Sequence, residues 1–183
     1  MEERAGLKIR IFGDPVLRKK AKPVKRVTFV HRDILSEMAQ IMYAGSGVGL
    51  AASQVGISEA MIVVDAGQGL YKLINPVIVK KKGSQAIEEG CLSLPGICIK
   101  VKRAAKVVVK AQDDSCEPVT IEADGLLACV FQHEIDHLNG KLIIDHASII
   151  DKLKIKKCLE RLKKRSEHER LRESEAKSCK LQL

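Results

Sequence analysis

The run 133–137, HEIDH, holds the residues whose types and spacing point most directly to chemistry. On a helix, residues i and i+4 lie on the same face, so both imidazoles can reach one metal ion. Glu134 follows the first histidine and is close enough to contact a water on that metal. Leu126 and Val130 precede the run at helical spacing, which predicts that the histidines point toward the buried side.

Cys91 is the best candidate for a third metal ligand. A catalytic metal usually takes three protein ligands and keeps one position open for water. The run 88–95, EEGCLSLP, places this thiol in a turn flanked by glycine. His146 and His168 are the later histidines, and neither belongs to an extended protease-type signature. A single cysteine is more often buried packing, so its neighbouring motifs must decide its role.

A glycine-rich segment at 47–54, GVGLAASQ, is the third element. It formally matches the dinucleotide fingerprint G-x-G-x-x-A, which must follow a strand. The residues before it have a helical pattern, so we reject that interpretation. Glycines also let a backbone approach a ligand closely. The side-chain amide of Gln54 can donate to developing negative charge.

The elements that position these residues predict an α+β fold. Apolar residues recur at helical spacing over 30–43, and a second helical pattern opens at Asp124-Gly125. Between them lie short β-branched runs at 60–65, 71–79, 97–101, 106–111 and 119–121. Because no regular βαβ alternation exists, mainly antiparallel strands are expected. We predict one domain over residues 1–150, followed by a tail over 151–183.

The basic charge is concentrated in that tail. The chain has 183 residues and a formal net charge of +9. Residues 152–183 contain 12 Lys or Arg and 5 Asp or Glu, a balance of +7. Ile155, Leu159, Leu162 and Leu171 recur among them at helical spacing, which predicts a basic amphipathic helix. Such a helix is either a solvated terminal element or an electrostatic handle for a polyanion such as RNA.

Composition excludes several other classes of protein. No run of about 18 apolar residues exists, so no membrane span is expected. Aromatic residues make up 3% of the chain, too few for a stacking platform for single-stranded nucleic acid. The six cysteines form no CxxC pair, and the N-terminus lacks the features of a secretory signal. Reduced thiols and a cytoplasmic location are expected.

Three motifs together resemble the peptide deformylase family. Its patterns GxGLAAxQ, EGCLS and QHExDHL occur in order at 47–54, 89–93 and 132–138. The resemblance runs from DPVLR at 14–18, through DGLLA at 124–128, to about Asp145. It implies a compact α+β fold with antiparallel sheets around a central helix that carries both histidines. It also implies a hydrolase that removes the formyl group from the N-terminal formylmethionine of new polypeptides and releases formate.

The resemblance also implies roles for residues of the site. One divalent metal would be held by Cys91, His133 and His137. Glu134 would take a proton from the attacking water and deliver it to the departing amine. The oxyanion would be bound by the side-chain amide of Gln54 and the backbone N–H of Leu92.

For the substrate, the resemblance implies an extended peptide that pairs with the protein backbone. The backbone segments concerned are those around Val48, Gly49 and Gly90. The methionine side chain would lie in a pocket lined by Leu126, Cys129 and Val130.

The donor set and the resemblance together indicate which metal and which partners to expect. One thiolate and two imidazoles suit Zn(II), Fe(II), Ni(II) or Co(II). The resemblance implies Fe(II) as the physiological ion, which zinc readily replaces in preparations. The partners would be N-formylmethionyl nascent peptides, and the tail resembles the basic C-terminal helix through which family members dock on the ribosome.

Two alternatives share these residues. A zinc metallopeptidase would need a third ligand other than Cys91. A non-catalytic, ribosome- or RNA-associated module would use its metal only to brace the fold. Such a structural site needs no Glu134 and fills its fourth position with protein, whereas only three good ligands are evident.

Overall fold

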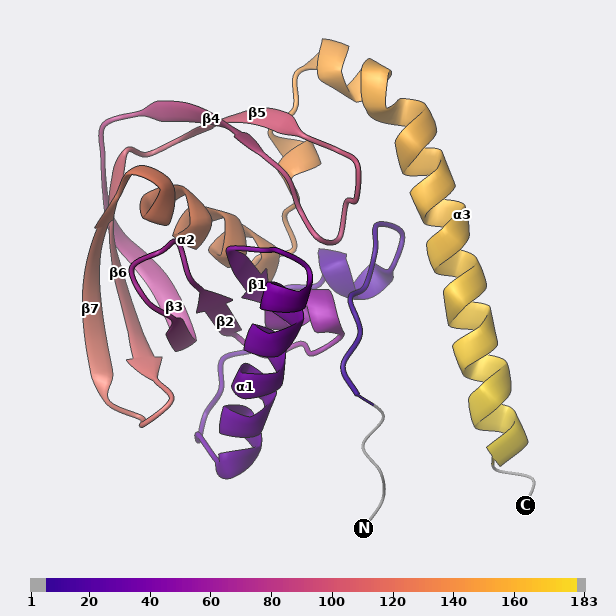
Figure 1. Ribbon diagram of the computed structural model, residues 1–183, viewed down its shortest axis with the longest axis horizontal. Coiled ribbons are helices and arrows are strands. Elements are labelled where there is room, and N and C mark those ends of the chain that lie inside the picture. The colour runs from indigo at the N-terminus through magenta and orange to yellow at the C-terminus, as the bar shows by residue number, and fades with distance from the viewer. Residues whose placement is uncertain (1–5, 181–183) are drawn as a thin grey trace.

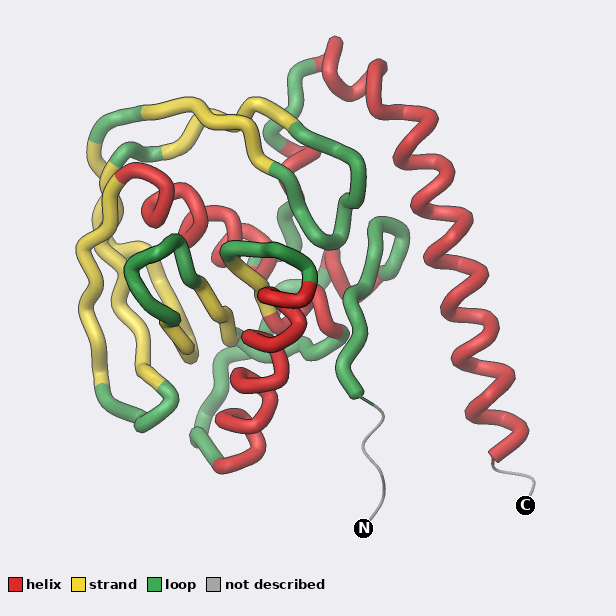
Figure 2. The backbone as a smooth tube through the Cα atoms, viewed as in Figure 1, coloured by secondary structure: helices red, strands yellow, loops and turns green. Residues whose placement is uncertain are grey.

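The computed structural model describes residues 6–180, with side chains as far as residue 173. Two antiparallel sheets and three α-helices build it (Figures 1 and 2). The larger sheet has the strand order β1-β2-β3-β6-β7, with β1 at Gly49–Ala51, β2 at Met61–Val64, β3 at Tyr71–Lys82, β6 at Lys106–Asp113 and β7 at Pro118–Asp124. The smaller sheet is a hairpin of β4, Gln85–Glu89, and β5, Ile99–Arg103.

Helix α2, Gly125–Leu138, is the central element (Figure 1). It packs against β1 and β2 and lies below the β4–β5 hairpin in that view. Eleven of its 14 residues are buried, because apolar side chains surround nearly its whole circumference. Phe131 on this helix packs edge-on against Tyr71 of β3, with ring centroids 5.6 Å apart. The fold class and the central histidine-bearing helix expected from the sequence are therefore confirmed.

Helix α1, Phe29–Ala44, packs on β1 and β2 and closes a second part of the core. Its buried side chains are Leu35, Met38, Ala39 and Met42, at the helical spacing read from the sequence. Short 3-10 turns complete the fold at η1, Pro15–Arg18, η2, Ala52–Val55, and η3, Ile143–Asp145.

Helix α3, Ile149–Lys180, is long and lies along one side of the molecule (Figure 1). Leu162 and Ser166 are buried, and Lys163 lies against Gly13 of the N-terminal segment. The predicted apolar stripe is correct for Leu162 but wrong for Leu171, whose side chain is 62% exposed. The body of the protein therefore supports α3 through its middle turns.

The sequence patterns missed β1 and β4. β1 has three residues and begins at Gly49, and β4 is half polar, so neither shows a β-branched run. Each forms because a neighbouring strand supplies its backbone partners, β2 for β1 and β5 for β4. These two strands flank the candidate site.

Candidate metal centre and active site

Three metal-ligand side chains meet at the middle of the molecule. Helix α2 places His133 and His137 one turn apart, with their Nε2 atoms separated by 3.2 Å. The turn after β4 brings the Sγ of Cys91 to 3.3 Å from the Nε2 of His137. These three donor atoms all lie within 4.8 Å of one another.

The donor set fits one divalent ion. Tetrahedral coordination with ordinary metal–nitrogen and metal–sulfur lengths separates donor atoms by about 3.3 to 3.6 Å. The observed separations of 3.2 and 3.3 Å are close to this range. Burial lowers the pKa of His137, so this imidazole is neutral, the state in which its nitrogen can ligate.

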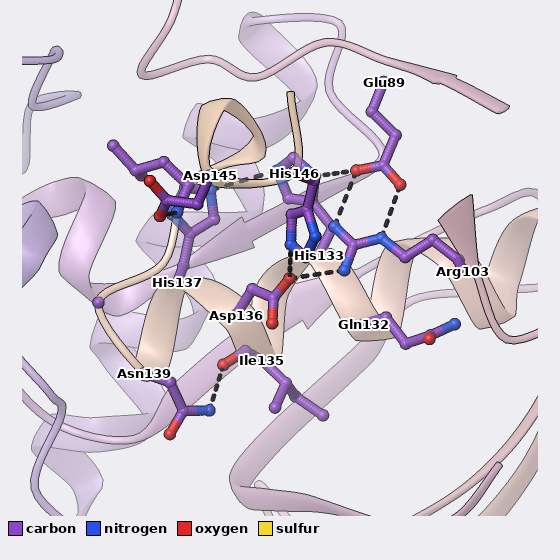
Figure 3. A network of polar contacts seen from close by, with 12 residues as sticks. Glu89, Arg103, Gln132, His133, Ile135, Asp136, His137, Asn139, Asp145 and His146 are labelled. Atoms are coloured by element: carbon purple, nitrogen blue, oxygen red, sulfur yellow. Dashed lines mark hydrogen bonds and ion pairs between the residues drawn. The ribbon is translucent and has the colours of Figure 1, made fainter. Parts of the chain in front are cut away.

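A carboxylate orients the first histidine (Figure 3). Glu89 Oε2 lies 2.9 Å from Nδ1 of His133, so the Nε2 of the same ring faces the other ligands. Arg103 donates to both oxygens of Glu89, at 2.7 and 2.9 Å, and to Asp136 at 2.6 Å. Burial raises the pKa of Glu89, but hydrogen bonds from Arg103 and His133 outweigh it and lower the pKa to about 2. Glu89 is therefore a permanent carboxylate.

Glu134 has a different environment from Glu89, although both are buried. Its Oε2 atom has no hydrogen-bond partner among the residues the structure describes. Burial raises the pKa of Glu134 to about 7, and electrostatic interactions with His133 and Arg103 only partly oppose this. A carboxylate that titrates near neutral pH can both accept and return a proton.

Gln54 points its amide toward the metal ligands. Its Oε1 accepts from the backbone N–H of Ala51 at 2.8 Å, which fixes the orientation of the amide. Its Nε2 then donates to Cys91 Sγ at 3.4 Å and to Ser93 Oγ at 3.3 Å. A neutral donor is thus held beside the thiol.

A cavity of about 360 Å³ opens onto these groups. All of the predicted site residues except His137 line it, and His137 belongs to the Cys/His/His cluster. Ser46, Gly47, Ile87, Glu88 and Glu89 complete the lining of the cavity.

Arg103 is the main functional residue that the sequence did not reveal. It lies 14 residues from Glu89 and 33 from Asp136, and the three meet because β4 pairs with β5 and the hairpin lies over α2. For Glu89 a signal did exist, because it is the first residue of the EGCLS motif.

The site combines a buried helix with two histidines, a cysteine thiol beside them, and a carboxylate whose Oε2 has no partner among the described residues. This is the arrangement of a metal-dependent hydrolase. The family model for polypeptide deformylase matches residues 7–153. The peptide deformylase of Halothermothrix orenii is 55% identical over 141 residues, which are 76% of this chain and 92% of that protein. That of Carboxydothermus hydrogenoformans is 50% identical over 143 residues, or 78% and 94% of the two chains.

Solved structures agree with the sequence relatives. The crystal structure of peptide deformylase from Thermotoga maritima superposes with a TM-score of 0.76 at 48% identity, covering 78% of this chain and 97% of that one. The Thermus thermophilus enzyme gives a TM-score of 0.82 at 37% identity, covering 86% and 98%. The chain belongs to the polypeptide deformylase family, metalloenzymes that remove the N-formyl group from formyl-methionyl nascent peptides. Among the described residues, no helix has the length and apolar character needed to cross a membrane.

Proposed function

We propose that Cys91, His133 and His137 bind a single Fe(II) ion in the cell, and that Zn(II), Ni(II) or Co(II) can replace it in preparations. The mixed thiolate and imidazole donor set supports this choice, because it suits each of these ions. When bound, the ion lowers the pKa of a water molecule and polarises the formyl carbonyl.

Glu134 is the general acid–base of the reaction. Its free Oε2 accepts a proton from the attacking water and later delivers that proton to the departing amine nitrogen. The pKa of about 7 supports both transfers, since neither protonation state is strongly favoured at neutral pH.

Gln54 and Leu92 stabilise the negative charge that develops on the formyl oxygen when water adds to the formyl carbon. The amide of Gln54 is oriented by its bond from the Ala51 N–H, and its Nε2 lies beside Cys91 in the wall of the cavity. The backbone N–H of Leu92 comes from the residue after this ligand, in a turn that lines the same cavity. Loss of one such donor typically costs on the order of 10²–10³ in rate.

The peptide lies between the edge of β1 and the segment around Gly90. The Val48 carbonyl already accepts from the Asp65 N–H at 2.9 Å. By the alternation of an antiparallel ladder, the backbone groups of Gly49 then face the free edge and can pair with an added strand. The methionine side chain enters the cavity between Ile87 of β4 and three residues of α2, namely Leu126, Cys129 and Val130.

In this proposal the tail over 151–183 binds the ribosome. The ten Lys and Arg side chains of α3 between 152 and 172 are all exposed, which supports contact with ribosomal RNA. The catalytic domain over 1–150 would then meet formylated chains in the cytoplasm as they emerge from the ribosome.

One observation carries the catalytic proposal: the buried, unpartnered carboxylate of Glu134 next to the Cys/His/His cluster. The test is formate release from a formyl-methionyl tripeptide by protein loaded anaerobically with Fe(II). Glu134→Gln should lose on the order of 10²–10⁴ in kcat with metal content unchanged. Glu122→Gln, an exposed change on β7, should match the parent. Absence of formate release from fully metallated parent protein would overturn the proposal.

Cys91→Ser separates this function from that of a metallopeptidase. Loss of the thiolate should reduce metal content together with formate release. A variant that retains its metal and cleaves internal peptide bonds would favour a peptidase with a different third ligand.

A further inference from the structure

Gln85 joins the β4–β5 hairpin to the first turn of α2. It is the first residue of β4, and its Nε2 donates to the Gly125 carbonyl at 2.7 Å. The same Nε2 lies 3.1 Å from Cys129 Sγ. Gly125 begins α2, and Cys129 lies one turn further along it, buried in the wall of the cavity. One side chain therefore spans the outer end of the gap between hairpin and helix.

Gln85 lies on the same face of β4 as Ile87, a residue that lines the cavity. Alternate residues of a strand share a face, and Gln85, Ile87 and Glu89 are the less exposed residues of β4. Glu89 holds the inner end of the strand through His133 and Arg103. Ile87 lies between the two attachments and lines the cavity. The separation of Ile87 from α2 is thus set at both ends by polar contacts.

The two attachments differ in strength. Glu89 belongs to a buried network with Arg103 and His133, whereas Gln85 makes neutral hydrogen bonds at a partly exposed position. A two-stranded hairpin has little stability of its own, so its distance from the helix depends on the side chains that bridge to it. This end of the hairpin has other contacts with α2, from Arg103 to Asp136, between Gln132 and the Ala104 backbone, and from the Gly125 N–H to the Ala105 carbonyl. The contact of Gln85 differs from these because it reaches a residue of the cavity wall, Cys129.

We propose that Gln85 is a positioning residue that determines side-chain specificity, because it sets the width of the pocket between Ile87 and Cys129. This inference rests on the proposed function of the cavity as the site for the formylated residue. Without the amide, the start of β4 loses its direct link to Cys129, so the wall between Ile87 and Cys129 can widen locally and fit methionine less closely. A mismatch of one methylene in an apolar pocket changes selectivity by roughly 10- to 200-fold.

The test compares two substrates on the metal-loaded, full-length chain. They are tripeptides that differ only in formyl-methionine or formyl-phenylalanine at the first position. Gln85→Ala and Gln85→Glu both lack the amide donor, and the second keeps the side-chain size. We expect each to lower the ratio of kcat/KM for methionine over phenylalanine about tenfold, mainly through a higher KM for methionine. Gln85→Lys retains a donor for the Gly125 carbonyl and should restore part of the ratio.

Gln112→Ala is the matched control, because it removes a glutamine from β6, outside the cavity lining. If Gln85→Ala does not fold, Gln85→Glu decides the question. An unchanged ratio in an active variant, with or without lower thermal stability, overturns the inference and leaves the proposed function intact. Absence of formate release by the parent on either substrate would instead be a failure of the proposed function.

Discussion

Gly49, at the free edge of the larger sheet, lies directly against the carboxylate of Glu134 on α2. A Cβ built at position 49 would overlap Glu134 Oε1 and come within 2.8 Å of Cγ1 of Val130. Only glycine lets β1 and α2 approach this closely. The glycine in the motif thus keeps the space that the carboxylate of Glu134, the acid–base group of the proposed mechanism, occupies.

Gly49→Ala should therefore impair chemistry without touching a metal ligand. The added methyl group forces Glu134 out of its position, and we expect kcat to fall on the order of 10²-fold or more. Metal content, measured by elemental analysis, should stay at one ion per chain. Gly6→Ala is a suitable control, since its Cβ would meet only Glu37 Oε1, at an ordinary 3.5 Å. Normal turnover by Gly49→Ala would show that Glu134 does not act from this position.

Arg103 should be the most costly charged side chain to remove. Its side chain is 5% exposed and neutralises Glu89 and Asp136, so Arg103→Met leaves uncompensated charge in the core. Breaking such a buried pair costs roughly 3–5 kcal/mol, which urea unfolding at pH 7 can measure. Lys106→Met breaks an ion pair with Asp124 that is exposed on both sides, and should cost less than about 1 kcal/mol.

The double variant Arg103→Met with Glu89→Gln tests the reason for that cost. Because the glutamine is neutral, it should recover part of the lost free energy of unfolding. If the double variant is less stable than Arg103→Met alone, charge burial is not the cause.

The sequence pointed more directly to the proposed ligands and acid–base group than to the residues that position them. The histidines and Glu134 are separated by at most four positions, and helical geometry alone brings them together. Arg103, which supports His133 through Glu89, and Gln85, beside the pocket, lie on strands whose pairing joins residues distant in the sequence. No local periodicity encodes that pairing, because a strand as short as β4 is stabilised mainly by its neighbours.

The ion pair between Arg18 and Asp145 should make a small, pH-dependent contribution to stability. Partial burial raises the pKa of Asp145, but hydrogen bonds from Arg18 and the Leu142 backbone outweigh it and bring the pKa below its ordinary value. A lowered native pKa means that the stabilisation is present above the unfolded value of about 3.9 and is lost as the pH falls through the native value.

Arg18→Met should accordingly lower the free energy of unfolding by less than about 1 kcal/mol at neutral pH, since both partners are partly exposed. The difference from the parent should be constant between about pH 5 and 7 and should close below about pH 4. Thermal unfolding across this range checks the prediction. A difference that widens on acidification would contradict it.

The proposed contact of α3 with the ribosome should be tested by charge reversal and not by deletion. Leu162 is buried against the body, so removing residues 152–183 would also remove part of the core. Lys157, Arg161 and Lys164 are all exposed and share one face of the helix at i, i+4 and i+7 spacing. Changing all three to Glu should abolish co-sedimentation with ribosomes and leave hydrolysis of a formyl-methionyl tripeptide unchanged.

Lys19, Lys20 and Lys25 supply the matched control, because they are exposed near the other end of the chain. Reversing them changes the net charge by the same amount. If co-sedimentation depends on the α3 face, this control should bind ribosomes nearly as well as the parent, with a similar dependence on salt. Equal loss in both triple variants would mean that overall charge attracts the chain to RNA, and α3 would then be no more than a solvated terminal helix.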